Sequence, residues 1–432
     1  MITQTLAGFV ATTPPETIPS ATLHMLRLSF LDWMAVGTAG AQEPVAQITR
    51  GLALQEQGTP QSHVFGDNIC VPARAAALVN GATSHALDYD DTHFAHIGHP
   101  SVAVISAALA MAERQSTSGC DLQVAALIGM ETSIRIGMWL GRDHYQAGFH
   151  QTGTAGAFGA AAAAARILGF DTQHTAMALG LVATRASGLK SQFGTMGKPY
   201  NAGIAAANGV EAALLVQGGF QANALGLDTA QGFGDTHFGQ ADMSALDGLG
   251  ADWLFDGISH KFHACCHGLH ATLEALAKVP DMSPENIDSI VVQTHPRWMT
   301  VCNQQAPDTG LEAKFSYRMV VAMALMGHAT AALDSYADAL CRDPEIVALR
   351  DRVSVVTAPT LTEMQAQLEI TLTNGTVHTV FHDLDAPMSQ SARTVRVTQK
   401  SVGLISQSAT DRNWALLTHD ASASDLGAAL NT

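Results

Sequence analysis

The chain has 432 residues, too many for one typical hydrophobic core, so we expect two domains. Hydrophobic residues make up 47% of it and charged residues only 14%, which indicates closely packed helices and excludes a disordered chain. The formal net charge of −16 argues against nucleic acid or an anionic membrane as a partner, so an acidic substrate needs a local positive pocket.

The N-terminal stretch MITQTLAGFVATTPP has no basic region and no long apolar core, so it does not resemble a signal peptide, and we expect a cytoplasmic enzyme. The most apolar stretch, TAGAFGAAAAAARILGF, is shorter than a membrane span and contains Arg166, which favours a buried helix. The six cysteines are scattered and form no CxxC motif, which argues against a disulfide framework or a structural zinc site.

From about residue 17 to about residue 280 the pattern is almost wholly helical. The stretch PARAAALVNGATSHALD is typical, because Pro72 stands in a first turn and an apolar stripe follows from residue 75 to residue 86. Alternation of β-branched residues then predicts strands in NIDSIVVQTH, DRVSVVTAP, AQLEITLTNG and TVHTVFHD. The pair Asn374-Gly375 predicts a two-residue hairpin turn between the last two of these strands.

These elements predict a mainly α fold. We expect an all-helical domain over residues 1–267, which a C-terminal helix rejoins over about residues 391–432. A smaller α+β domain occupies residues 268–390, and its own helices include EAKFSYRMVVAMALMGHAT.

A histidine or a lysine stands before four apolar helices. His99 precedes PSVAVISAALAMAE, His150 precedes QTGTAGAFGAAAAAARIL, Lys198 precedes PYNAGIAAANGVEAALL, and Lys261 lies near the start of a fourth helix in KFHACCHGLHATLEAL. Several helix N-termini aimed at one pocket bind carboxylates without many basic side chains. The same field keeps His99 or His150 neutral and able to act as a base, and Asp88, at the close of its helix, is placed to orient an imidazole.

Each conspicuous residue also has a structural interpretation. Lys198 is otherwise an ordinary solvated loop lysine, and Tyr317 opens a helix of the second domain, where a structural role competes with a lid role. We assign structural roles to the remaining polar residues of the first domain that stand out: His85, His93, His96, His144, Asp90 and Asp91. No metal site is predicted, because Gly98 and Pro100 interrupt the histidine-rich segment 85–101 and no HExxH pattern occurs.

At these residues the sequence resembles the MmgE/PrpD family, which includes 2-methylcitrate dehydratase, cis-aconitate decarboxylase and iminodisuccinate epimerase. The matching pieces, in the family's order, are LSFLDWMAVGTAG, NGATSHALDYDDTH, GHPS, GFHQTGTAGAFGAAAAAARILG, FGTMGKPYNAGIAAANGVEAALL, KFHACCHGLHA and EAKFSYRM. The resemblance implies a large helical domain closed by a smaller α+β lid, a homodimer, and catalysis without metal or organic cofactor.

Carried over to this sequence, the resemblance implies an active site around four catalytic candidates. They are Asp88, His99, His150 and Lys198. The candidates for substrate binding are Thr92, Lys261, His270, which best matches the end of its motif, and Tyr317. The chain departs from the family at His263, where an aromatic residue is usual, and at Asn201, where many members have histidine. Both departures bear on the choice of substrate.

The resemblance implies proton transfer at a carbon next to a carboxylate. Lys198 and the helix N-termini are the candidates that stabilise an enediolate-like intermediate, and His99 and His150 are the acid/base pair, with the two roles unassigned. We expect a lyase that dehydrates a small hydroxy di- or tricarboxylate, such as 2-methylcitrate. The alternatives are an epimerase of an amino- or imino-dicarboxylate, a cis-aconitate-type decarboxylase, a non-catalytic paralogue and a metal hydrolase that uses segment 85–101.

Overall fold

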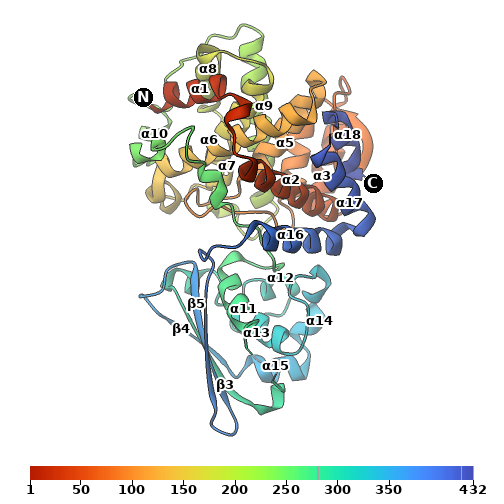
Figure 1. The fold of residues 1–432 in the computed structure, drawn as a ribbon, viewed down its shortest axis with the longest axis vertical. Helices are drawn as coiled ribbons and strands as arrows, with labels where there is room; N and C mark the ends of the chain where they lie inside the picture. Colours follow the sequence, from red (N-terminus) through yellow and green to blue (C-terminus); the bar gives the residue numbers. More distant parts are fainter. Residues whose placement is uncertain (280–281, 420, 432) are drawn as a thin grey trace. The chain divides into compact units, whose positions relative to one another are not determined.

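The computed structural model describes residues 1–279, 282–419 and 421–431. Its contacts divide the chain into two compact units: unit 1 consists of Met1–His260 with Thr394–Thr432, and unit 2 consists of Lys261–Arg393. Unit 1 is helical, and unit 2 combines short helices with a four-stranded sheet (Figure 1). The predicted fold class, mainly α with a smaller α+β part, is confirmed.

Unit 1 is built around α7, whose first fifteen residues are all buried. Helices α5, α6, α8 and α9 pack against it, since its surface consists almost entirely of alanine, glycine and threonine. The helices of the unit are α1 (Ile2–Thr12), α2 (Ser20–Gly40), α3 (Pro44–Glu56), α4 (Ala73–Ser84), α5 (Pro100–Gln115), α6 (Gly119–Gln146), α7 (Gln151–Ile167), α8 (Thr172–Val182), α9 (Gly197–Gln217), α10 (Phe233–Thr236), α16 (Gln390–Ile405), α17 (Gln407–Thr418) and α18 (Ala423–Ala428).

Glycines allow the central helices to approach one another closely. A Cβ atom on Gly81 of α4 would lie 2.9 Å from the carbonyl oxygen of Ala202 in α9. A Cβ atom on Gly129 of α6 would lie 2.6 Å from the carbonyl oxygen of Gly159 in α7. Both distances are too short for any side chain, so these crossings depend on glycine. As a result the ends of α4, α7 and α9 lie near one another.

One short hairpin interrupts the helical pattern of unit 1. Strands β1 (Ser62–Val64) and β2 (Asp67–Val71) pair antiparallel between α3 and α4. The sequence pattern does not reveal this hairpin, because strands of three and five residues are too short to show a clear alternation.

A buried ion pair joins the C-terminal helices to the connection between α4 and α5. The Lys400 ammonium of α16 lies 2.6 Å from the Asp32 carboxylate of α2 and donates to the Tyr89 carbonyl oxygen at 2.6 Å. Lys400 is also 4.0 Å above the centre of the Tyr89 ring. Because all three side chains are almost fully buried, this pair fixes the backbone that carries Asp88 and Asp90.

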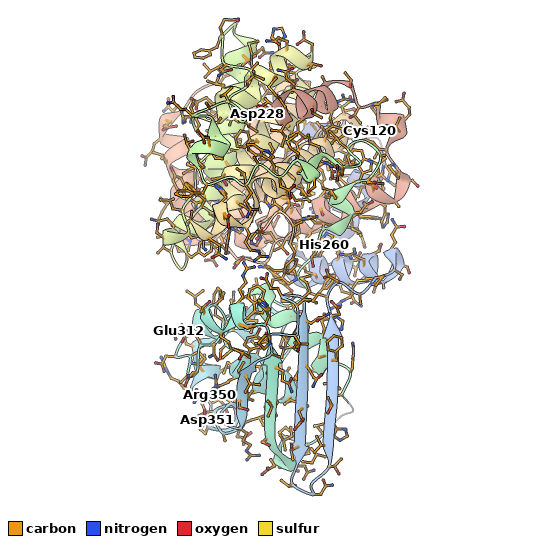
Figure 2. All side chains as sticks on the ribbon, turned by 90° about the vertical axis from the view of Figure 1, so that its left-hand side faces the viewer. Cys120, Asp228, His260, Glu312, Arg350 and Asp351 are labelled. Atoms are coloured by element: carbon orange, nitrogen blue, oxygen red, sulfur yellow. The ribbon has the colours of Figure 1, made fainter. Side chains whose placement is uncertain are left out.

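Unit 2 contains a sheet with the strand order β4-β3-β5-β6, in which only β3 and β4 run parallel. Helices pack on one face of this sheet, and the Arg350–Asp351 ion pair lies at the C-terminal end of another helix of the unit (Figure 2). The strands are β3 (Ile287–Thr294), β4 (Val353–Thr357), β5 (Gln365–Leu372) and β6 (Val377–Asp383), and the helices are α11 (His270–Leu276), α12 (Gly310–Ala313), α13 (Tyr317–Leu325), α14 (Asp338–Cys341) and α15 (Pro344–Arg350). All four predicted strands are confirmed.

Two local predictions in unit 2 are wrong. The β5–β6 loop has three residues rather than two, because Leu372 N–H donates to the Thr376 carbonyl oxygen and Gly375 alone takes a positive φ, of 87°. A type I′ turn would also require a positive φ at Asn374. The long helix expected from Glu312 is divided into α12 and α13, since Ser316 caps α13. Within the described ranges, none of the helices combines the length and apolar composition that a bilayer crossing requires.

Candidate active site

Three helices of unit 1 begin with the residues that the sequence analysis places there. His99 is the N-cap of α5, His150 is the N-cap of α7, and Lys198 is the second residue of α9. The side chains of both histidines leave their own helix N-termini uncapped. Thr152 does not cap α7 either, because its hydroxyl oxygen accepts a hydrogen bond from His99 N–H at 3.1 Å. This bond ties the start of α5 to the start of α7.

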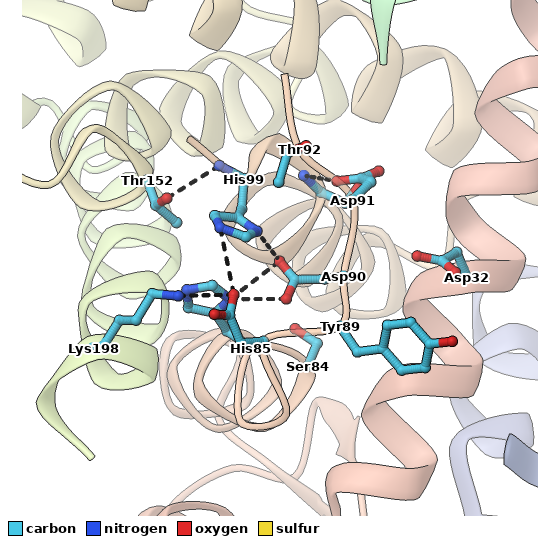
Figure 3. Close-up of polar contacts among 12 residues, drawn as sticks. Asp32, Ser84, His85, Tyr89, Asp90, Asp91, Thr92, His99, Thr152 and Lys198 are labelled. Atoms are coloured by element: carbon cyan, nitrogen blue, oxygen red, sulfur yellow. Dashed lines mark hydrogen bonds and ion pairs between the residues drawn. The ribbon is translucent and has the colours of Figure 1, made fainter. Parts of the chain in front are cut away.

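A buried carboxylate joins two of the histidines (Figure 3). Asp90 accepts from His85 Nδ1 at 2.9 Å, and its other oxygen lies 2.8 Å from His99 Nδ1. Burial alone would raise the pKa of Asp90, but the two imidazoles hold it well below its ordinary value. The structural roles favoured for these residues, a turn cap for Asp90 and a capping or surface position for His85, do not describe them, since each side chain is buried in this cluster.

Asp88 connects the same cluster to Lys198. One carboxylate oxygen of Asp88 lies 2.8 Å from Lys198 Nζ and 3.6 Å from His99 Nε2 (Figure 3). The helix α4 ends at Ser84, so the prediction that Asp88 closes this helix is wrong. Asp88 instead has a φ of 52°, in the left-handed region that aspartate adopts more readily than most residues. This conformation allows the chain to turn back within a few residues of the helix end.

His150 completes the cluster on its other side. Its ring stacks on His85, with centroids 6.0 Å apart, and the Phe193 ring meets its face edge-on at 4.9 Å. Because His85 also packs against His99 at 4.5 Å, the three imidazoles form one group. Burial lowers the pKa of His150 well below its ordinary value, and the neighbouring charges of His85 and Lys198 lower it further.

The remaining candidates from the sequence are Thr92, Lys261, His270 and Tyr317. Thr92 forms a short antiparallel bridge with Ser259, to whose carbonyl oxygen its N–H donates at 2.9 Å. Lys261, His270 and Tyr317 belong to unit 2. Lys261 is buried, but the prediction that it lies near a helix start is wrong, because residues 261–266 are irregular and α11 begins only at His270.

Within unit 2, His270 and Tyr317 have different surroundings. His270 is buried against the rings of His263 and His267, and burial lowers its pKa well below the ordinary value. The Tyr317 hydroxyl donates to the Gly268 carbonyl oxygen at 2.8 Å and lies 2.9 Å from the Thr294 hydroxyl. The proposed substrate-binding roles of these residues stay predictions.

Asp91 lies directly behind the cluster and is fully buried. Its carboxyl group accepts hydrogen bonds from the backbone and the hydroxyl of Ser101, in the first turn of α5. Burial raises the pKa of Asp91 to about 7, helped by the negative charges of Asp32 and Asp90 and opposed by the bond from Ser101. Asp91 therefore retains its proton in the folded protein at pH values where an ordinary aspartate has lost it.

This raised pKa predicts a pH-dependent stability. The folded protein holds a proton on Asp91 that the unfolded chain releases, so the stability present at low pH is lost as the pH rises toward 7. We expect the wild type to lose roughly 2 kcal/mol more than Asp91→Asn between pH 5 and pH 8. Urea unfolding of both proteins across this range measures the difference. If the unfolding free energies of the two proteins change in parallel with pH, Asp91 is already ionised in the folded protein at pH 5.

The comparison with Asp91→Asn is necessary because buried histidines make the protein more stable as the pH rises, which opposes the effect of Asp91. Burial lowers the pKa of His93 and of His144 to about 4 and that of His96 to about 3. Each of these histidines adds stability as the pH rises toward the pKa that it has in the unfolded chain. This effect is the same in the wild type and in the variant. The difference between the two proteins therefore isolates Asp91.

The same cluster contains the only potential metal ligands found together among the described residues. His85, Asp88, Asp90 and His99 each offer an atom, and these atoms lie within 4.8 Å of one another. Two features favour proton transfer over metal binding. The Lys198 ammonium already neutralises Asp88 at 2.8 Å and would repel a cation, and Asp90 already contacts two imidazoles.

Comparison with known proteins identifies the family. Residues 4–246 match the MmgE/PrpD N-terminal domain, and residues 263–400 match the MmgE/PrpD C-terminal domain. The chain is 31% identical to a cis-aconitate decarboxylase-like protein of Aspergillus oryzae, over 66% of this chain and 62% of that protein, so the match spans less than two thirds of that relative. It is also similar to the cis-aconitate decarboxylases of Aspergillus terreus (28% identity, 75% of this chain and 72% of that protein) and Mus musculus (27%, 88% and 81%). The two domain matches together cover most of the sequence, and the chain belongs to the MmgE/PrpD enzyme family, as its motifs predict.

Proposed function

We propose that the chain is a metal-independent lyase that acts on a small tricarboxylate by proton transfer at a carbon next to a carboxylate. The observation that carries this proposal is the group formed by the buried His99 and His150 and the half-buried Lys198 at three converging helix starts. The cis-aconitate decarboxylases among its relatives make decarboxylation of cis-aconitate the first activity to test. Dehydration, which the sequence analysis favours, is the second.

Each group has a distinct role in this proposal. Lys198 and the uncapped N-termini of α7 and α9 bind substrate carboxylates and stabilise the negative charge of an enediolate-like intermediate. His99 and His150 exchange protons with the substrate, and Asp90 orients His99. Asp88 holds the Lys198 ammonium in place before the substrate arrives.

The same groups serve either lyase reaction. In decarboxylation, the bond to the departing carboxylate breaks, its electron pair delocalises toward a remaining carboxylate, and an imidazole N–H delivers a proton to carbon. In dehydration, a neutral imidazole removes the proton next to the carboxylate and the second imidazole protonates the leaving hydroxyl. Epimerisation would need removal and return of one proton on opposite faces, without a leaving group.

The assay therefore offers several substrates at once. Purified enzyme is incubated in deuterated water with cis-aconitate, 2-methylcitrate, citrate and iminodisuccinate. We expect carbon dioxide to be released from cis-aconitate and one deuteron to enter the product, followed by NMR. A new ultraviolet-absorbing double bond from a hydroxy acid would instead identify a dehydratase. Deuterium exchange with neither change would reject the lyase proposal in favour of an epimerase, and no reaction at all would favour a non-catalytic paralogue.

Two further parts of the proposal are tested on the same preparation. Elemental analysis should find no stoichiometric zinc or manganese, and a metal that copurifies and restores activity after chelation would contradict the metal-independent mechanism.

The proposed assembly is a homodimer, as the family resemblance implies, and light scattering of the purified protein measures its mass.

A further inference from the structure

Asn201 contacts the proposed acid/base group from the first turns of α9. Its side chain is almost fully buried, and its amide nitrogen Nδ2 lies 3.2 Å from His150 Nδ1. The same nitrogen donates to the Leu189 carbonyl oxygen at 3.4 Å. The amide therefore lies between two partners that belong to one rigid stretch of backbone, because His150 N–H donates to the Gly188 carbonyl oxygen at 2.9 Å.

The Leu189 carbonyl decides which way the amide points. A carbonyl oxygen accepts hydrogen bonds and cannot donate them, so it faces the NH₂ group of Asn201 and would repel its oxygen. With this orientation, Nδ2 presents its second hydrogen to His150 Nδ1. His150 Nδ1 must then accept, and it carries no proton.

The surroundings of His150 keep its ring neutral. His85, His99 and Lys198 are the cationic or titratable groups that disfavour a positive charge on it, and Asp88 is the group that favours one. Burial also disfavours the positive charge, and it is the largest cause that holds the pKa of His150 well below its ordinary value. A neutral ring with a bare Nδ1 carries its single proton on Nε2.

His99 has the opposite arrangement. Its Nδ1 lies 2.8 Å from the Asp90 carboxylate, whereas its Nε2 lies 3.6 Å from the Asp88 carboxylate, so the closer carboxylate favours the proton on Nδ1. The neutral form of His99 then has its lone pair on Nε2. The two histidines of the cluster therefore hold complementary tautomers: one offers a proton at Nε2 and the other can take one up.

We propose that Asn201 is a positioning residue that fixes His150 as the Nε2–H tautomer, and that His150 is therefore the proton donor of either lyase reaction. His99 is the proton acceptor in dehydration, where a proton is removed from carbon. The assignment of catalytic roles rests on the proposed function, whereas the tautomer of His150 does not. Asn201 acts through His150, so its replacement should change proton transfer more than substrate binding.

The tautomer is measured directly on protein labelled with ¹⁵N-histidine, with His150 assigned by comparison with His150→Gln. In the wild type near neutral pH, we expect Nδ1 to show the chemical shift of an unprotonated nitrogen and Nε2 that of a protonated one. A protonated Nδ1 would overturn the proposal. This measurement needs no substrate, so it separates failure of the inference from failure of the proposed lyase activity.

Two variants then link the tautomer to turnover. Asn201→Leu removes the donor at similar size, so both tautomers should become populated and kcat should fall about 10-fold with little change in KM. Asn201→Asp replaces the donor by an acceptor, so the proton should move to Nδ1. We then expect kcat to fall about 100-fold and the acidic limb of the pH profile to shift upward, because a carboxylate stabilises the imidazolium.

Asn208→Leu is the matched control. Asn208 is also buried on α9, but its amide bonds Arg185 and not the histidine cluster. This variant should lose stability while keeping the His150 shifts and the kcat of the folded enzyme. If Asn201→Asp and Asn201→Leu fold but leave the His150 shifts and the pH profile unchanged, Asn201 has only a structural role.

Discussion

Replacing His99 by asparagine is expected to lower kcat for dehydration, which removes a proton from carbon, about 1,000-fold while changing KM by no more than about threefold. The ring is the proposed proton acceptor, and no other described group combines a buried carboxylate at Nδ1 with the start of a converging helix. Asparagine retains a polar side chain at the N-cap of α5, so the helix start should survive. Steady-state kinetics with the substrate identified above measures both constants.

The control for this prediction is His93→Asn. His93 comes from the same loop and is equally buried, but its ring bonds the Leu254 carbonyl oxygen instead of the cluster. The variant should therefore lose comparable stability and keep most of its turnover per folded molecule. Equal losses of kcat in His93→Asn and His99→Asn would mean that loop order, not proton transfer, explains the effect.

Asp90→Asn tests the Asp90–His99 pair by changing the carboxylate instead of the ring. An amide can present its NH₂ group to His99 Nδ1 and so favour the wrong tautomer, without removing either ring. Its effect on kcat should approach that of His99→Asn, and the double variant should be little worse than the single ones, because residues that act as one unit are not additive. Full additivity would contradict the coupling of Asp90 to His99.

Sequence reasoning could place His99, His150 and Lys198 because each precedes a long helix of small residues. That signal is local: a histidine or lysine, a helix start, and enough alanine and glycine for helix ends to come together. The strands of unit 2 were predictable for a similar reason, because their alternation extends over five to eight residues.

Asp90 and His85 could not be found in this way. They lie beyond the end of α4, where the left-handed φ of Asp88 reverses the chain and removes any helical spacing between them. Their partner His99 comes from the next helix, so the contact depends on tertiary packing that no local pattern encodes. The helix start expected at Lys261 fails for a related reason, since apolar residues near a glycine-containing loop show helical spacing without forming a helix.

Replacing Lys198 by methionine should lower kcat/KM about 10,000-fold, the largest effect expected of any single change here. Methionine retains most of the side-chain volume but removes the ammonium that contacts Asp88. Two losses then combine. The intermediate loses its charge stabilisation, and the carboxylate of Asp88, no longer neutralised, repels a substrate that is itself a polyanion.

These two contributions separate in a double variant. Lys198→Met with Asp88→Asn removes both charges, so substrate repulsion should disappear and KM should recover toward the wild-type value, whereas kcat should stay low because the ammonium is still missing. Recovery of kcat as well would mean that Lys198 serves only to neutralise Asp88. Lys190→Met is the matched control, because Lys190 lies in the preceding loop and donates to the Tyr145 carbonyl oxygen at 3.1 Å. It should change turnover less than about twofold, since Lys190 packs on the ring of Tyr145 and its loss removes no charge from the cluster.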